Sequence, residues 1–66
     1  MNQKEKAVLK QCFEEPDTLK NISLAAGLSL QETKKILEDL ASFGFIVNSD
    51  NIWETTVNGD KFFKKL

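Results

Sequence analysis

The chain has 66 residues, of which 41% are hydrophobic and 29% charged, a composition typical of one small folded domain over residues 1–66. Nine lysines and no arginine stand against ten acidic residues, so the formal net charge is -1 and no overall basic field attracts a polyanion. With no histidine and one cysteine, the chain lacks the residue types of a usual zinc site or a histidine-based catalytic dyad. We therefore expect no enzyme activity, no cofactor and no metal site.

The single cysteine, Cys12, cannot form an internal disulfide, and it lies in an apolar helical pattern. This predicts a buried thiol in a reducing compartment. No apolar run approaches the roughly 20 residues needed to cross a bilayer, and the N-terminal Met-Asn-Gln-Lys lacks the apolar region of a signal peptide. We expect a cytoplasmic protein without a membrane partner.

Two helices are expected in the first part of the chain. The first runs from about Gln3 to Glu15, with Asn2 as its N-cap and Pro16 as its stop. Its apolar stripe consists of Val8, Leu9, Cys12 and Phe13.

The second helix is short and is capped by the hydroxyl of Thr18. Gly27 ends it, because glycine tolerates a positive φ. The apolar positions between these ends repeat at helical spacing: Leu19, Ile22 and Ala26.

A third helix is predicted over about residues 30–43. Ser29 and Glu32 form a capping box at its start, and Gly44 terminates it. Its inward face is expected to hold Thr33, Ile36, Leu37, Leu40 and Phe43. The side chains expected to point elsewhere are Gln31, Lys34, Lys35, Glu38 and Ser42.

A hairpin and a last helix complete the predicted order. The β-prone runs 45–47 and 52–55 are separated by turn formers at 48–51. Thr56 can cap a final helix, although Gly59 near its start argues against one. The apolar residues of this helix are Phe62, Phe63 and Leu66. The fold class is therefore mainly α with a small β-hairpin.

Two helices joined by an Ala-Gly-Leu-Ser turn and followed by a hairpin resemble the winged helix-turn-helix domain of MarR-like and related small bacterial or archaeal regulators. The matching residues, in order, are Gly27-Leu28-Ser29, Ile36-Leu37, Leu40, Gly44-Phe45-Ile46, Trp53, Thr56 and Gly59. The resemblance implies a three-helix core, a two-stranded wing and a C-terminal helix. It also implies a DNA-binding transcriptional regulator that places the helix at about 30–43 in the major groove of double-stranded DNA.

Several polar residues suit that role. The amide of Gln31 can pair with adenine, and Lys34 and Lys35 can meet phosphates or a guanine edge. Thr18 and Lys20 begin the helix that crosses the DNA backbone in such domains, where a hydroxyl, a backbone N–H and a lysine could hold a phosphate. The candidate nucleic-acid-binding residues are Thr18, Lys20, Gln31, Lys34 and Lys35, with the capping Ser29 as a secondary candidate.

The wing departs from the pattern of the resembled domains. Its tip contains Asp50 and no basic residue, so insertion of the wing into the minor groove is not expected. Trp53 on the second strand is expected to pack against the core or the wing.

A homodimer built from the terminal helices is a further hypothesis, because the last helix carries more apolar surface than it can easily hide. The candidate dimer-interface residues are Leu9, Phe62, Phe63 and Leu66. The alternative is that both phenylalanines close the core of the monomer.

The function itself has two interpretations. The first is a small regulator that occupies a promoter. The second is a winged-helix protein-protein interaction module that does not bind DNA directly, in which Glu32, Glu38 and Asp39 face a protein partner. The absence of arginine and the negative net charge favour the second interpretation.

Overall fold

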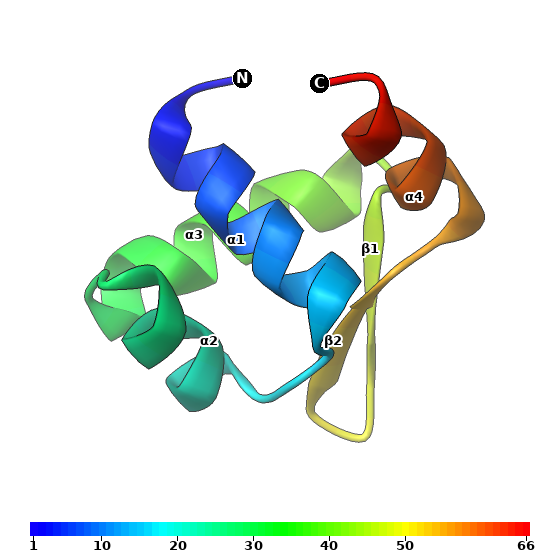
Figure 1. Ribbon diagram of the computed structural model, residues 1–66. Helices are drawn as coiled ribbons and strands as arrows, with labels where there is room; N and C mark the ends of the chain where they lie inside the picture. Colours follow the sequence, from blue (N-terminus) through cyan, green and yellow to red (C-terminus); the bar gives the residue numbers. More distant parts are fainter.

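The computed structural model describes all 66 residues, which form four helices and one hairpin (Figure 1). In chain order the elements are α1 (Gln3–Glu14), α2 (Leu19–Ala26), α3 (Leu30–Ser42), β1 (Ile46–Ser49), β2 (Ile52–Thr55) and α4 (Val57–Lys64). The predicted fold class and the predicted order of elements are confirmed. The two termini lie at one end of the molecule, and the turn of the hairpin lies at the other (Figure 1). None of the four helices has the length and apolar character required to span a membrane.

One core joins the first three helices and β1. Its buried side chains are Val8, Leu9, Cys12, Ile22, Ile36, Leu37, Leu40 and Ile46. Each fully buried aliphatic side chain contributes about 1.5–3 kcal/mol relative to exposure, so this cluster is the main source of stability. Burial raises the pKa of the Cys12 thiol to about 12, so the thiol stays protonated and unreactive at neutral pH. Cys12 has an exposed fraction of 0%, which confirms its predicted burial.

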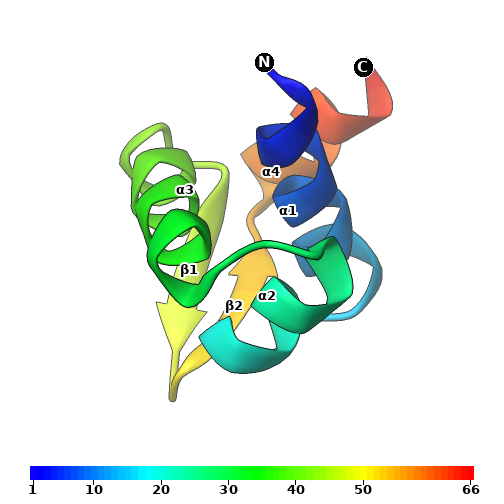
Figure 2. The same cartoon turned by 90° about the vertical axis from the view of Figure 1, so that its left-hand side faces the viewer.

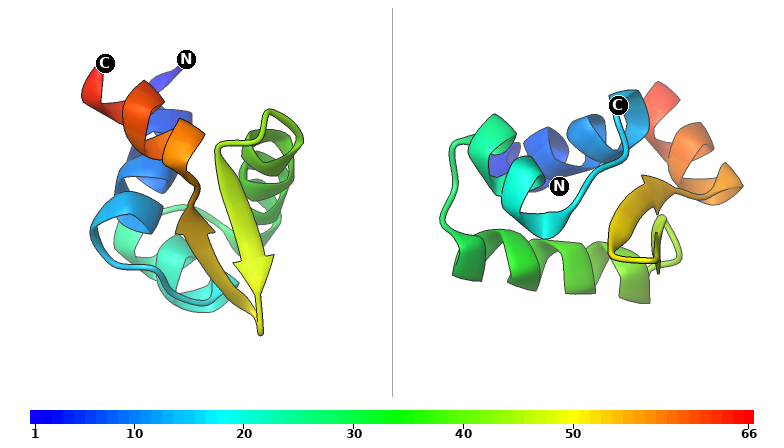
Figure 3. Two further views of the ribbon diagram at one scale, coloured as in Figure 1. Left: turned by 90° about the vertical axis from the view of Figure 1, so that its right-hand side faces the viewer. Right: turned by 90° about the horizontal axis from the view of Figure 1, so that it is seen from below.

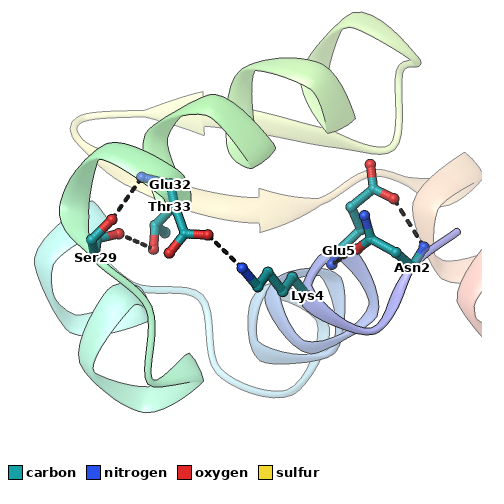
Figure 4. Close-up of polar contacts among 6 residues, drawn as sticks. All are labelled: Asn2, Lys4, Glu5, Ser29, Glu32 and Thr33. Atoms are coloured by element: carbon teal, nitrogen blue, oxygen red, sulfur yellow. Dashed lines mark hydrogen bonds and ion pairs between the residues drawn. The ribbon is translucent and has the colours of Figure 1, made fainter.

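The helix ends follow the local sequence closely. Asn2 and Glu5 form a complete capping box at α1, which the sequence analysis did not identify beyond the cap itself (Figure 4). Gly27 and Gly44 have φ values of 69° and 81°, so both adopt the left-handed conformation expected after α2 and α3. At α3 only half of the expected box is present: the Ser29 hydroxyl accepts the N–H of Glu32 at 3.0 Å.

The hairpin has a tighter turn than predicted. β1 pairs antiparallel with β2, and the last pair is Ser49 with Ile52. Only Asp50 and Asn51 form the turn, with φ values of 52° and 66°, as the two central residues of a type I′ turn require. The predicted turn over 48–51 was therefore too long, and the predicted strand over 45–47 began one residue early.

A segment before α2 extends this small sheet. The backbone N–H of Trp53 donates to the carbonyl oxygen of Asp17 at 2.8 Å, so the linker between α1 and α2 lies beside β2. Trp53 is partly buried and packs against the core cluster, which confirms its predicted packing role. The wing is thus tied to the start of α2.

Aromatic contacts attach α4 to the rest of the molecule. Phe62 stacks on Phe45 with ring centroids 4.3 Å apart, and Phe63 lies 4.8 Å from Phe13. Both residues of α4 are half-buried within the monomer. Phe62 and Phe63 therefore help to close the core of the monomer, which was the alternative to a role in a dimer interface.

Two expectations about apolar residues were wrong. Leu9 has 0% exposure and belongs to the core, so it cannot line a dimer interface. Phe43 was expected on the inward face of α3, but the helix ends at Ser42 and the Phe43 side chain is 64% exposed. Phe43 follows the last residue of α3, and its ring packs against that of Phe45, with centroids 5.9 Å apart, instead of entering the core.

Candidate nucleic-acid interface

The third helix lies along one edge of the molecule, with α1 and α2 covering a single side of it (Figure 3, right). Figure 2 shows α3 on one side and α1 with α4 on the other. The buried residues of α3, Thr33, Ile36, Leu37 and Leu40, face the core. The opposite face of the helix is free for a partner.

That outward face is entirely polar. It is a shallow surface lined by Ser29, Gln31, Glu32, Lys34, Lys35 and Glu38. All six side chains are exposed, as predicted for Gln31, Lys34, Lys35 and Glu38. Gln31 lies in the first turn of α3, the part of a recognition helix that usually reaches base edges.

Two ion pairs involve charges of α3. The Nζ atom of Lys4, on α1, lies 2.7 Å from Oε2 of Glu32 (Figure 4). The hydrogen bond from Lys4 and its positive charge lower the pKa of Glu32. The carboxylate is directed to Lys4 on α1 and does not complete the capping box at Ser29. Within α3, the Nζ atom of Lys35 lies 3.2 Å from Oδ1 of Asp39.

The two lysines of α3 that were predicted to contact DNA differ in their ion pairing. Lys35 is partly neutralised by Asp39 and must give up that pair to meet a phosphate with its full charge. Lys34 forms no ion pair and keeps its charge available. Lys34 is therefore the stronger candidate of the two.

A groove of about 550 Å³ lies between α3, the start of α2 and the wing. Its lining consists of Thr18, Leu19, Lys20, Leu30, Lys34, Leu37, Glu38, Asn48, Asn51 and Trp53. The structure thus brings together three of the predicted residues, Thr18, Lys20 and Lys34. Ser29, Gln31 and Lys35 lie outside this groove, on the outward surface of α3.

Asn48 and Asn51 also line the groove, and neither was predicted from the sequence as a candidate contact. Their amide groups can donate hydrogen bonds to phosphate oxygens. The signal that could have found Asn48 is the hairpin register, which pairs it with Trp53 and so places it beside the groove. Without the two-residue turn, that register could not be assigned.

The start of α2 is less open to a phosphate than predicted. The backbone N–H of Thr18 already donates to Oδ1 of Asp17 at 2.7 Å, and the Thr18 hydroxyl accepts the N–H of Asn21 at 3.3 Å. Hydrogen bonds from the Asn21 side chain and the Thr18 N–H lower the pKa of Asp17, so its carboxylate stays charged. The charge of Asp17 repels phosphate. Lys20 is the basic group of this helix start that can attract one.

Two helices joined by a short turn, α2 and α3, with the second of them exposed and a hairpin beside it, define the winged helix-turn-helix class of domain. The family model described as winged helix-turn-helix matches residues 6–66. The chain therefore belongs to the winged helix-turn-helix family, as the sequence resemblance predicted.

Solved structures with the same fold include regulators. A protein of unknown function from Listeria innocua superimposes with a TM-score of 0.90 at 20% identity, over 97% of this chain and 49% of that one. A MarR family transcriptional regulator from Silicibacter pomeroyi gives 0.87 at 10% identity, over 98% and 50% of the two chains. A transcriptional regulator from Thermotoga maritima gives 0.84 at 18% identity, over 97% and 50%.

The chain spans about half the length of these solved proteins, and at such identities the likeness establishes the fold. No curated protein sequence matches the chain.

Proposed function

We propose that this protein is a small DNA-binding transcriptional regulator that places α3 in the major groove. The observation that carries the proposal is the shared groove of Lys20 and Lys34, in which two unpaired ammonium groups from α2 and α3 lie beside the amides of Asn48 and Asn51. Four donors on three elements suit a phosphate backbone that runs between α3 and the wing. A regulator of this kind acts on DNA in the cytoplasm.

Each candidate residue has a separate role in this proposal. Gln31 meets base edges, since its amide suits adenine, and Lys34 contacts a phosphate beside the groove. Lys20, Asn48 and Asn51 contact phosphates and set the orientation of the domain. Thr18 lines the groove, and Ser29 caps the start of α3. Lys35 contacts a phosphate after its ion pair with Asp39 is broken.

Titration of the protein with mixed-sequence duplex DNA at two salt concentrations tests the proposal. Two lysine–phosphate contacts give a log–log slope of about -1.8, so affinity should fall about twelvefold between about 50 and about 200 mM salt. Fluorescence anisotropy of labelled duplex measures both values. Absence of binding at the lower concentration contradicts direct DNA binding.

Absence of DNA binding would favour the alternative, a protein-protein interaction module. The charge of the wing supports that alternative, because Asp50 is exposed at the tip of the hairpin and no lysine accompanies it. A protein partner for the α3 face would then meet a surface with both signs of charge.

We also propose a homodimer through the outer face of α1 and α4. A shallow hollow there is lined by Gln3, Lys6, Ala7, Lys10, Phe63 and Leu66. Leu66 is 52% exposed, and burial of its side chain against a second copy would remove this apolar surface from water. Phe62 lies away from this hollow, against Phe45, and takes no part in it.

A dimer predicts that Leu66→Asp changes the sedimentation coefficient of the protein from that of a dimer to that of a monomer. The substitution leaves the core intact, because Leu66 lies beyond the end of α4. Leu24→Asp on α2 is a matched control, since Leu24 is 70% exposed and lies outside the hollow. A wild-type protein that sediments as a monomer at high concentration contradicts the dimer.

A further inference from the structure

Glu38 is the one acidic side chain of α3 that has no lysine partner. The other two carboxylates of this helix are paired, Glu32 with Lys4 at 2.7 Å and Asp39 with Lys35 at 3.2 Å. Glu38 is exposed and lines both the outward surface of α3 and the groove toward the wing. Its charge is therefore presented to whatever occupies the α3 face.

A free carboxylate on a DNA-binding face makes the affinity depend on the base that it meets. It repels the phosphate backbone and lowers affinity for every duplex. It also accepts hydrogen bonds and donates none, so it needs a donor on the edge of a base. Only a base that supplies this donor offsets the cost of the charge.

The major groove offers such a donor most cleanly at cytosine, which presents its N4 amino group. Adenine also presents an amino group, but its N7 acceptor lies beside it and repels the second carboxylate oxygen. Guanine and thymine present acceptors in the groove, and thymine adds a methyl group. Cytosine is therefore the base that suits Glu38.

The spacing along α3 is suited to reading several base pairs. Gln31, Lys34 and Glu38 stand at positions i, i+3 and i+7, which share one face of a helix. From the first to the third of them the helix rises by about 10 Å, about the length of three base-pair steps. An amide, an ammonium group and a carboxylate thus follow one another on the same stripe.

We propose that Glu38 determines specificity by accepting a hydrogen bond from the N4 amino group of one cytosine in the target DNA. This inference rests on the proposed function and names the chemistry that its target must contain. The carboxylate favours binding to duplexes that hold the cytosine and disfavours binding to those that do not.

Selection from random-sequence duplexes at about 50 mM salt, where phosphate contacts are strong, tests the inference. The wild-type protein and the Glu38→Gln variant are selected in parallel. The matched control is Glu14→Gln, which makes the same charge change on α1 and lies outside both surfaces. Circular dichroism of each variant shows whether the fold is retained.

We expect the wild-type protein and Glu14→Gln to enrich a cytosine at one position. Replacement of that cytosine by thymine should weaken wild-type binding at least about fivefold, the lower end of the usual effect of one mismatched base pair. Glu38→Gln should bind unselected duplex several-fold more tightly than the wild type, because the repulsion is gone. Its preference at that position should vanish or move to adenine, which suits an amide.

Two results overturn the inference, and they can be distinguished. If the folded wild type and Glu38→Gln both bind DNA but enrich the same sequences with equal discrimination, Glu38 does not read a base and the regulator proposal still stands. If no folded protein binds any duplex, direct DNA binding fails and this inference fails with it.

Discussion

Gly59→Ala is expected to destabilise the protein by at least about 3 kcal/mol, the upper part of the usual range for overpacking a filled site. A Cβ atom at Gly59 would overlap the carbonyl oxygen of Phe45 and lie 2.8 Å from its carbonyl carbon. These are backbone atoms, so no side-chain rotation can relieve the clash. The same carbonyl accepts the N–H of Thr56 at 3.0 Å, which holds the start of α4 against it.

This loss is large relative to the total free energy of unfolding expected for a domain of this size. A single core in a domain of this size rarely supplies more than about 3–5 kcal/mol, so a loss of about 3 kcal/mol leaves about 0–2 kcal/mol and a marginally stable variant at 25 °C. Alanine favours a helix by about 1 kcal/mol over glycine, and this gain is too small to offset the clash. Urea denaturation followed by circular dichroism measures the difference.

Asn58→Ala provides the control, because Asn58 is exposed in the same turn of α4. It should change the free energy of unfolding by less than about 0.5 kcal/mol, as surface substitutions usually do. A Gly59→Ala protein as stable as the wild type would contradict the close packing of α4 on Phe45.

Replacing both Lys20 and Lys34 by alanine is expected to remove most DNA affinity while leaving the fold intact. The two ammonium groups are exposed, line one groove and form no ion pair within the protein. Each lysine–phosphate contact contributes about 0.9 to the log–log salt slope, so the slope should approach zero in the double variant. Duplex titration over a range of salt concentrations gives the slope directly.

Lys61→Ala with Lys64→Ala is the matched control for charge. Both residues are exposed on α4 and lie outside the α3 surface and the groove. If the control weakens binding as much as the test variant does, DNA is attracted by overall charge, or contacts a different surface. Lys35→Ala should have a smaller effect than Lys34→Ala, because Asp39 already neutralises part of its charge.

The elements of the fold could be predicted because their signals are local. The bounds of α2 depend on Thr18 and Gly27, which lie in or beside the helix they delimit. The start of α3 depends in the same way on Ser29. The hairpin was less predictable, since Asn48 and Ser49 have turn-forming side chains yet pair with β2. The two-residue turn at Asp50 and Asn51 overrides that preference by setting the register.

The candidate interface was predicted in part. Exposure of Gln31, Lys34 and Lys35 follows from the 3.6-residue period of α3, because that period fixes which side chains face away from the core. Which of these lysines is unpaired could not be predicted. The Lys35 pair with Asp39 is one of several geometrically allowed pairings along the helix, and packing and rotamers select among them.

By itself, the sequence of this protein determined four helices, a hairpin and a polar face on the third helix, since caps, glycines and apolar periods act within a few residues. Tertiary structure decided the rest. It buried Leu9, neutralised Glu32 with a lysine 28 residues away, and made Gly59 necessary where α4 meets Phe45. These outcomes depend on contacts between segments far apart in the chain, and only the folded arrangement sets those distances.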